Sequence, residues 1–325
     1  MYGGSVISCS TEQRAYVFVE DNDILEFEVE GKNRRVSSKE DLIQDNGVFD
    51  AILSVIEYFD LDDAKIKITI RSDIPVSSGL SGSTAIITAL VAALLEWMNK
   101  NGYKPDEKTA WSKTLPLNKY LLAETVRHIE LYFLKIVCGY QDAYMCSFGS
   151  LNFLDFRDKE NYMSLKREPL GTVEDLSATS PNIPIILAHT GIKRVSGSVH
   201  KPIRDRWIEG DRHVIDGVLR ISHIARMAKK AVLSGDWELL GEAMTENHEI
   251  VRSFGSSSEV NEKIIRTALD SGAIAAKLAG AGKGGTIIAL NPEPDEMIEA
   301  LRNAGAGRIL FPRPVDGILK ESETK

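Results

Sequence analysis

A serine- and glycine-rich segment at residues 74–86, IPVSSGLSGSTAI, has the composition of a phosphate-binding loop. Gly79 and Gly82 allow the backbone to approach a ligand closely. The segment follows a strand-like run, KIKITI, and leads into a long apolar stretch with helical spacing. A loop that ends at a helix N-terminus directs backbone N–H groups and the positive end of the helix dipole at an anion. We therefore expect this loop to bind phosphate; the alternative is a flexible loop whose serine caps the helix.

This first loop has neither of the two most common nucleotide-binding patterns. It is not a P-loop of the form GxxxxGK[ST], because no lysine follows Gly82, and it does not contain the dinucleotide-binding pattern GxGxxG. If this loop binds a nucleotide, it must do so with a loop type other than these two.

A second glycine-rich segment, KLAGAGKGGTIIAL, occupies residues 277–290. It contains four glycines within six positions and continues into a strand-like apolar run. Taken alone, a tight structural hairpin explains it as well as ligand contact does. Two such segments in one chain favour phosphate binding. Lys283 lies among the glycines, where its ammonium group can reach a nucleotide phosphate or project outward, and the sequence leaves both open.

A third segment, VCGYQDAYMCSFGSLNF at residues 137–153, places Asp142 beside Gly139. We expect Asp142 to lie between two helical stretches, where an acidic side chain can point into a cleft. Most aspartates near a glycine are cap or turn formers, so the residue types alone leave its role open.

Other polar residues have weaker patterns. Thr190, Gly191, Lys193 and Arg194 follow a strand-like run, and they can bind an acceptor or a phosphate or form a solvated basic turn. His200 and His248 each lack a second ligand four residues away, which favours packing or capping over catalysis.

Composition excludes several classes of protein. The 325-residue chain has a net charge of −8, and its 39 lysines and arginines are spread along it, which disfavours nucleic-acid binding. The longest apolar run, at residues 85–95, is too short for a membrane span, and the N-terminus does not resemble a secretory signal. Three scattered cysteines form neither a disulfide framework nor a zinc motif. We therefore expect a cytoplasmic protein without membrane or nucleic-acid partners.

The chain is long enough for roughly two domains. A composition break at residues 172–184 predicts domains at 1–175 and 176–325. Strands are expected at Ser5–Cys9, Ala15–Val19, Ile24–Val29, Lys65–Ile70, Ile183–Ala188 and Arg308–Phe311. Helices are expected at Asn46–Phe59, Thr84–Asn99, Lys119–Ile136, Trp207–Ser234, Trp237–Phe254, Val260–Ser271 and Pro294–Asn303. The order of elements in the second half predicts a split α+β sandwich.

Together the three segments resemble the motifs of the GHMP kinases, the superfamily of galactokinase, homoserine kinase, mevalonate kinase and phosphomevalonate kinase. The pattern P-x-x-x-G-L-x-S/G-S-x-A is met from Pro75 to Ala85. The pattern K-L-x-G-A-G-G-G-G is met from Lys277 to Gly285, with Lys283 as the one change. Within the superfamily, GLSGSTAI, GYQDAYMCSFGSLNF, SGSVHKPIRDRWIEGD and MTENHEIVRSFG are similar to the sugar kinases of the glucuronokinase and heptose-phosphate kinase type.

The resemblance implies a two-domain α+β fold. It comprises an N-terminal mixed α/β domain with a left-handed β-α-β nucleotide loop and a C-terminal ferredoxin-like split βαβ domain. Family members begin with a strand and loop, P-x-R-x-x-x-x-G-x-x-x-D, ahead of the segment that aligns with Tyr2 to Val6. That opening is missing here, so we expect one strand and part of the acceptor site to be absent from these 325 residues.

The resemblance also implies roles for individual residues. Asp142 would contact the acceptor hydroxyl and act as base, while Ser83 and a helical glutamate would bind Mg²⁺. We choose Glu130 for that glutamate, and Glu124 remains an alternative. ATP phosphates would be bound by Ser78, Gly79, Leu80, Ser81, Gly82, Ser83, Thr84, Gly280, Ala281, Gly282 and Gly284. The acceptor would be bound by Gly139, Thr190, Gly191 and Arg194.

The expected function is that of an ATP- and Mg²⁺-dependent kinase acting on a hydroxyl of a sugar or uronic acid, as a monomer or homodimer. A mevalonate-branch kinase, such as one that phosphorylates the 5-hydroxyl of mevalonate 3-phosphate, is the alternative enzyme. A non-catalytic nucleotide-binding protein is the alternative outside enzymes. The physical requirements of phosphoryl transfer suit the first two, because positioning and electrostatics supply most of the rate.

Overall fold

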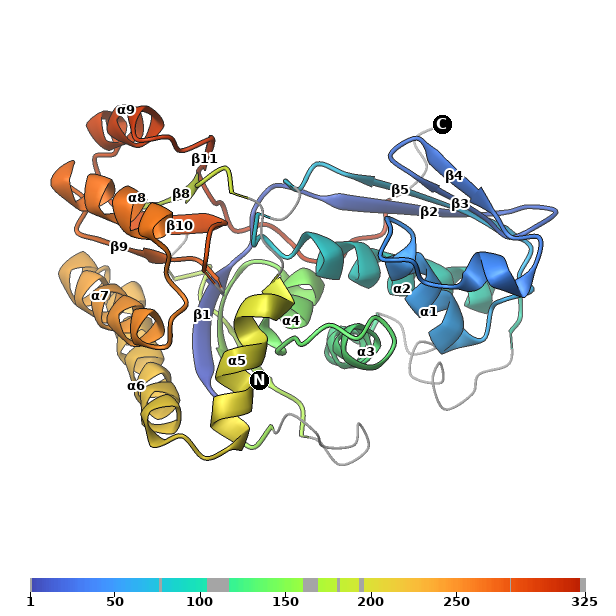
Figure 1. The fold of residues 1–325 in the computed structure, drawn as a ribbon, viewed down its shortest axis with the longest axis horizontal. Helices are drawn as coiled ribbons and strands as arrows, with labels where there is room; N and C mark the ends of the chain where they lie inside the picture. The colour runs from blue at the N-terminus through green and yellow to red at the C-terminus, as the bar shows by residue number, and fades with distance from the viewer. Residues whose placement is uncertain are drawn as a thin grey trace. The chain divides into compact units, whose positions relative to one another are not determined.

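The computed structural model describes residues 2–75, 78–103, 117–159, 169–179, 182–192, 196–280 and 282–321, without the side chains of 196–198. Runs of strands and runs of helices follow one another through this part of the chain, which confirms the predicted α+β class (Figure 1). Two compact units form from discontinuous segments. The first unit comprises Met1–Glu12, Pro75–Leu80 and Gly149–Val315, and the second comprises Gln13–Ile74, Ser81–Phe148 and Asp316–Lys325. The domain boundary at residues 175 and 176 stays a prediction.

The second unit contains a four-stranded sheet in the order β2-β5-β3-β4. Its strands are β2 (Ala15–Asp21), β3 (Glu26–Val29), β4 (Lys32–Arg35) and β5 (Ile66–Ser72). The β3–β5 pair is parallel and the other pairs are antiparallel. Alternate residues of β5 (Ile66, Ile68 and Ile70) are buried, as the period of two in a strand requires when one face packs on a core. Helices lie along that face (Figure 1).

The helices of the second unit include α1 (Asp50–Phe59), α2 (Gly82–Lys100), α3 (Lys119–Tyr132) and α4 (Gln141–Phe148). In α2, the side chains at the predicted spacing of Ile87, Leu90, Val91 and Leu94 are fully buried. The helix packs against α1, α3 and α4. Among the described helices, α2 alone has the length and composition of a membrane span, but a buried core helix of a soluble protein has the same properties.

The first unit contains two antiparallel sheets. One has the order β1-β6-β7, formed by Ser5–Cys9, Leu151–Asp155 and Thr172–Asp175. The other has the order β11-β8-β10-β9, formed by Arg308–Leu310, Ile185–His189, Thr286–Leu290 and Ala275–Leu278.

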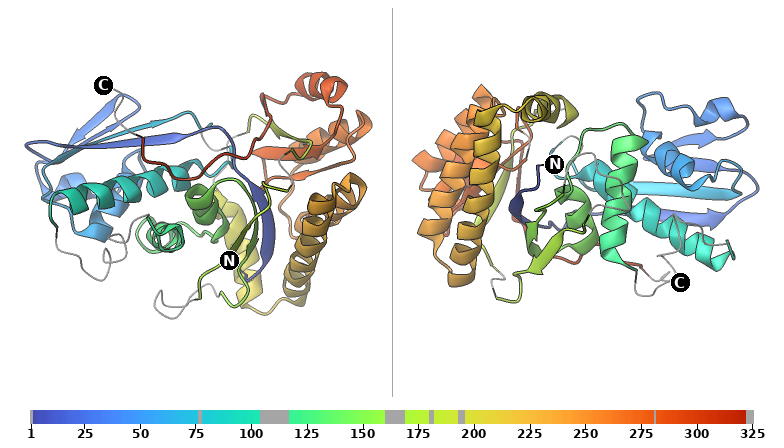
Figure 2. Two further views of the ribbon diagram at one scale, coloured as in Figure 1. Left: turned by 180° about the vertical axis from the view of Figure 1, so that it is seen from behind. Right: turned by 90° about the horizontal axis from the view of Figure 1, so that it is seen from below.

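Helices cover both sheets of the first unit: α5 (Ser196–Ile208), α6 (Arg212–Ser234), α7 (Trp237–Ser253), α8 (Glu259–Asp270) and α9 (Asp295–Asn303). Helices α6 and α7 lie side by side (Figure 2). Helix α6 packs on β1, α7 packs on β9, and α8 packs on β9, β10 and α9. Ile264, Ala276, Ile287 and Leu301 form part of the resulting core.

The observed elements differ from the sequence expectations at several places. Asp142 lies in the first turn of α4 and not between two helices. Trp207 lies near the end of α5 and does not begin a helix, because Gly210 adopts a left-handed φ of 83° and Asp211 then caps α6. The strands β4 and β7 were not expected from their polar sequences, KNRR and TVED, and they form because neighbouring strands pair with them.

Candidate active site

The two glycine-rich segments meet in the first unit. The hydroxyl of Thr286, at the start of β10, donates a hydrogen bond of 2.8 Å to the backbone carbonyl of Ser78. Both residues are buried, at 4% and 1% exposure. The Leu80 N–H donates to the Ser78 hydroxyl at 3.3 Å, and Gly79 between them has a left-handed φ of 79°. Residues 78–80 therefore form a tight turn fixed against the second glycine segment, as expected if both serve one anionic ligand.

Asn261, near the N-terminus of α8, holds the second glycine segment at Gly284. The Gly284 N–H donates to Asn261 Oδ1 at 2.8 Å, and Asn261 Nδ2 donates to the Gly284 carbonyl at 3.2 Å. Gly284 has φ of 113°, and a Cβ there would lie 3.1 Å from Ile192 Cγ2. Because Gly284 and Asn261 are both buried, the two backbone groups of Gly284 depend on this side chain for their hydrogen bonds. The sequence expectations did not include Asn261, whose only signal was an amide side chain near the start of a helix.

We expect Asn261→Ala to lower the free energy of unfolding by about 2 to 4 kcal/mol, because two buried backbone groups lose their partners. Asn261→Asp should cost less, since a carboxylate still accepts from the Gly284 N–H. Urea titration measures both effects. Asn303→Ala, at an exposed position at the end of α9, is the matched control and should change stability by less than about 0.5 kcal/mol. If the Asn261→Ala and wild-type proteins were equally stable, the two hydrogen bonds between Asn261 and Gly284 would not contribute to stability as proposed.

Two of the residues predicted to bind the acceptor lie beside the second glycine segment. The Thr190 N–H donates to the Gly285 carbonyl at 2.8 Å, and the Gly285 N–H donates to the Ile192 carbonyl at 3.3 Å. Gly191 is exposed, with φ of 76°, and its N–H donates to His189 Nδ1 at 2.7 Å. Arg194, and Ala281 of the phosphate set, lie outside the described residues.

The first turn of α2 lies in the second unit and continues the loop directly after Leu80. Ser81 adopts a left-handed φ of 57°, and its carbonyl accepts from the Ala85 N–H at 2.9 Å. Gly82, Ser83 and Thr84 form the first turn, whose N–H groups have no partners within the helix. Such a terminus stabilises an anion, and the α2 macrodipole adds to this effect.

A buried carboxylate lies against this turn. The Thr84 hydroxyl donates a 2.6 Å hydrogen bond to Glu130 Oε1 of α3, and both side chains are buried. Ser83, the neighbouring residue chosen as the Mg²⁺ ligand, is exposed. The pKa of Glu130 is raised to about 7, chiefly by burial; the Thr84 hydrogen bond lowers it, and the charge of Asp142 raises it again. A cation beside Glu130 would offset the cost of ionising this buried carboxyl group and would lower its pKa.

Asp142 is exposed in the first turn of α4, and its charge acts on Glu130. Gly139 lies two residues ahead of that helix, and a cation–π contact fixes the intervening Tyr140. The buried guanidinium of Arg127 lies 4.4 Å from the centre of the Tyr140 ring. Glu130 and Asp142 therefore form a pair of carboxylates of different environments, one buried and one open to solvent.

Glu124, the alternative metal ligand, has a different environment. Its carboxylate accepts a hydrogen bond from the Tyr144 hydroxyl of α4, and both residues are buried. Glu130, in contrast to Glu124, has two cysteines close to it, Cys138 and Cys146. Burial raises the pKa of the Cys138 and Cys146 thiols, and the charges of Glu130 and Asp142 raise it further, so both remain protonated at neutral pH.

The described residues fit a magnesium–nucleotide complex better than an all-protein metal site. No group of three or more His, Cys, Asp or Glu side chains in the described part of the chain is placed to hold a metal. Mg²⁺ is usually bound by one or two carboxylates together with substrate phosphates and water. Glu130 provides a buried carboxylate, and the adjoining helix terminus provides N–H groups for phosphate oxygens.

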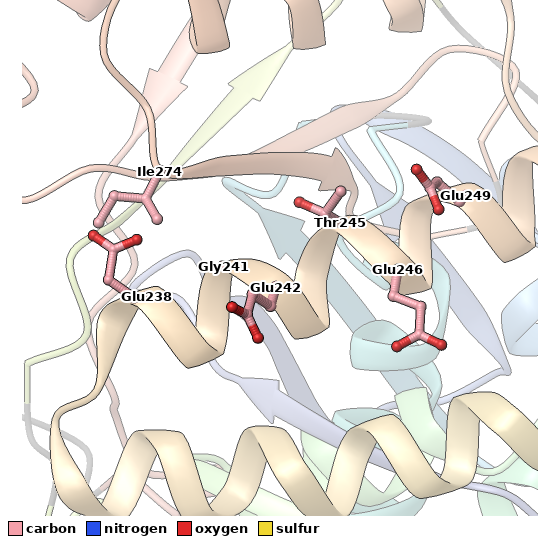
Figure 3. A pocket seen from close by; sticks show the side chains of 7 residues that line it. All are labelled: Glu238, Gly241, Glu242, Thr245, Glu246, Glu249 and Ile274. Atoms are coloured by element: carbon pink, nitrogen blue, oxygen red, sulfur yellow. The ribbon is translucent and has the colours of Figure 1, made fainter.

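A separate surface pocket of about 350 Å³ lies along α7, lined by Glu238, Gly241, Glu242, Thr245, Glu246, Glu249 and Ile274 (Figure 3). Glutamates predominate among these side chains, and Glu246 is paired with Arg220 of α6. Its negative charge repels a polyphosphate. The pocket is therefore not part of the candidate site.

Two protein-family models match this chain. Residues 46–150 match the family model described as the GHMP kinases N terminal domain, and residues 228–307 match the one described as GHMP kinases C terminal. Together these segments make up more than half of the chain, and both the α2 turn and the second glycine segment lie within them.

Similar curated proteins include sugar kinases and mevalonate kinases. The chain is 28% identical over 217 residues to the D-glycero-alpha-D-manno-heptose 7-phosphate kinase of Campylobacter jejuni, covering 66% of this chain and 58% of that protein. It is 28% identical over 245 residues to the probable glucuronokinase 2 of Arabidopsis thaliana, covering 74% and 61%. The mevalonate kinase of Pyrococcus horikoshii is 27% identical over 326 residues, covering 94% and 88%. The matches to the first two thus span about three fifths of those proteins.

Solved structures share the fold. The galactokinase of Lactococcus lactis, complexed with galactose, has a TM-score of 0.73 and 15% identity, covering 97% of this chain and 89% of that one. The phosphomevalonate kinase of Streptococcus pneumoniae, in complex with phosphomevalonate and AMPPNP, has a TM-score of 0.66 and 14% identity, covering 93% and 94%.

Proposed function

Because this chain belongs to the GHMP kinase family, we propose that it is a kinase that transfers the γ-phosphoryl group of ATP to a hydroxyl of a sugar or uronic acid. One observation carries the proposal: the Thr286–Ser78 hydrogen bond fixes the first loop against the second glycine segment. Four residues after Leu80 the same loop reaches Thr84, which binds the buried Glu130. The chain thus has N–H donors for phosphate oxygens, a carboxylate for Mg²⁺ and an exposed carboxylate for the acceptor.

The residues have separate roles in this proposal. Backbone N–H groups within residues 78–84 and those of Gly280 and Gly282 bind and orient the phosphates of ATP, while Gly284, whose own N–H is held by Asn261, shapes the segment around them. Glu130 and the Ser83 hydroxyl would hold Mg²⁺, which when bound would neutralise charge on the phosphates. Asp142 accepts a hydrogen bond from the acceptor hydroxyl and takes its proton as the new P–O bond forms. Gly139, Thr190, Gly191 and Arg194 bind the acceptor.

The identity of the acceptor rests on the relatives. Heptose 7-phosphate kinase and glucuronokinase act on sugars and uronic acids by name, which favours that class. Mevalonate or a phosphorylated mevalonate, such as mevalonate 3-phosphate, is the second candidate, because the Pyrococcus mevalonate kinase matches nearly the whole chain. The proposed enzyme is cytoplasmic, acts as a monomer or homodimer, and has neither nucleic-acid nor membrane partners.

An acceptor panel tests the proposal. The purified chain is incubated with ATP and Mg²⁺ and with glucuronate, a heptose 7-phosphate, galactose, mevalonate or mevalonate 3-phosphate, and ADP release is followed by a coupled assay. We expect turnover with one sugar or uronic acid at least about 100-fold above the rate without acceptor. Turnover with a mevalonate alone would move the assignment to the second candidate. Nucleotide binding without turnover on any acceptor would contradict the kinase proposal.

A further inference from the structure

Lys283 is an exposed lysine within a buried glycine segment. Gly282, Gly284 and Gly285 on either side of it are buried, whereas the Lys283 side chain is exposed. Its backbone is held at two successive residues: the Lys283 N–H donates to the Ser256 carbonyl at 2.7 Å, and both backbone groups of Gly284 bind Asn261. These hydrogen bonds hold the backbone from which the Lys283 side chain projects.

The backbone at Lys283 has a conformation that suits glycine. Its φ is 54°, in the left-handed region where a Cβ crowds the following carbonyl. Among the described residues, the Lys283 ammonium forms neither an ion pair nor a hydrogen bond that would offset this strain. Strain without a compensating contact in the folded protein is typical of positions that serve a ligand.

We infer that Lys283 is a nucleotide-specificity residue, whose ammonium group binds the β- or γ-phosphate of ATP; this inference rests on the proposed function. The two glycine segments provide neutral N–H donors, and the chain as a whole carries a net charge of −8, so bulk charge does not attract a polyphosphate. A lysine among these donors adds a positive point charge to the site. It discriminates between nucleotides by the number of their phosphates.

The inference predicts that Lys283→Gly lowers the affinity for Mg·AMPPNP without lowering the melting temperature of the protein. Lys283→Gly removes both the ammonium group and the strained Cβ, and Lys283→Met removes the ammonium group alone. We expect both variants to bind Mg·AMPPNP about 10- to 30-fold more weakly than wild type, the lower part of the range for one charge-assisted contact, because the lysine is exposed. Binding of adenosine should change by less than about 2-fold. The melting temperature of Lys283→Gly should not fall and should rise by about 2 to 4 °C if the strain is relieved.

Isothermal titration calorimetry on the full chain, with AMPPNP, ADP, AMP and adenosine, measures these effects. Repeating the AMPPNP titration at about 0.05 M and 0.5 M salt should shrink the difference between wild type and Lys283→Met, because an exposed ion contact is screened. Lys283→Arg keeps the charge and should restore most of the affinity. Two controls lie away from the segment: Lys230→Met removes an exposed charge on α6, and Glu30→Gly relieves a left-handed φ of 49° at an exposed turn. Both should bind AMPPNP as wild type does.

The outcomes separate this inference from the proposed function. If wild type binds Mg·AMPPNP and both Lys283 variants bind it equally well, the role of Lys283 is wrong and the kinase proposal stands. If the Lys283 variants lose adenosine binding to the same extent, the residue is structural and the inference is overturned. If wild type binds no adenine nucleotide, the proposed function fails and the inference fails with it.

Discussion

Asp142→Asn is expected to lower kcat for the acceptor identified by the panel by about 10² to 10⁴-fold, the usual contribution of a general base. Asparagine has nearly the same shape as aspartate and is equally suited to the first turn of α4, so the helix should remain intact. The amide still touches the acceptor hydroxyl but cannot accept its proton. The loss should therefore appear in kcat, while the affinity for Mg·AMPPNP changes by less than about threefold.

Steady-state kinetics and calorimetry on the same protein samples measure the two quantities. Asp216→Asn, which changes an exposed carboxylate on α6, is the matched control and should retain wild-type kcat. If Asp142→Asn turns over as fast as wild type, the assignment of Asp142 as base is wrong. If it loses nucleotide affinity and kcat in the same proportion, Asp142 holds the bound metal–nucleotide complex instead of the proton.

The sequence predicted most of the fold because local patterns and tertiary packing agree there. The apolar spacing of α2 and of α7 predicted both helices to within two residues of their ends. The polar strands β4 and β7 were missed because their own side chains do not favour a strand, and pairing with β3 and β6 decides their structure. The α5 helix was missed except for its last two residues, because its composition is polar and it contains Pro202.

Glycine-rich composition predicted which two segments lie together, whereas the ligand that they bind stays a prediction. The two glycine segments were paired on composition alone, and the Thr286–Ser78 hydrogen bond brings them together. Sequence spacing could not choose between Glu124 and Glu130, because both lie on α3 and both are buried. Their partners differ only in three dimensions: Tyr144 binds Glu124, and Thr84 binds Glu130. Asn261 was missed because its contact with Gly284 joins residues 23 positions apart.

Glu130→Gln is expected to stabilise the ligand-free protein at pH 8 and to abolish Mg²⁺-dependent nucleotide binding. Burial raises the pKa of Glu130 to about 7, against 4.5 for an unperturbed glutamate. The folded state therefore holds a proton that the unfolded state releases between these two values, and the free energy of unfolding falls as the pH rises from about 4.5 to 7. Full ionisation above pH 7 costs up to about 3 kcal/mol, at about 1.4 kcal/mol for each pH unit of the shift. Glutamine still accepts from the Thr84 hydroxyl and carries no charge, so it avoids this cost.

The pH dependence of the free energy of unfolding shows whether ionisation of Glu130 causes the difference between the variant and wild type. Urea titrations without ligand should give similar stabilities for wild type and Glu130→Gln near pH 4, where the carboxyl is protonated in both states. The variant should become the more stable protein as the pH is raised to 8. Adding Mg²⁺ and AMPPNP at pH 8 should reverse the order, because a cation at Glu130 stabilises the ionised carboxylate only in wild type.

Glu124→Gln provides the comparison that separates the two glutamates. It lies on the same helix, is equally buried and keeps a Tyr144 partner, so a general loss of packing would affect both variants alike. We expect Glu124→Gln to retain the stabilisation by Mg²⁺ and AMPPNP that Glu130→Gln loses. The reverse pattern would move the metal to Glu124. A Glu130→Gln protein that is stabilised by Mg²⁺ and AMPPNP as strongly as wild type would show that the buried carboxylate serves the fold alone.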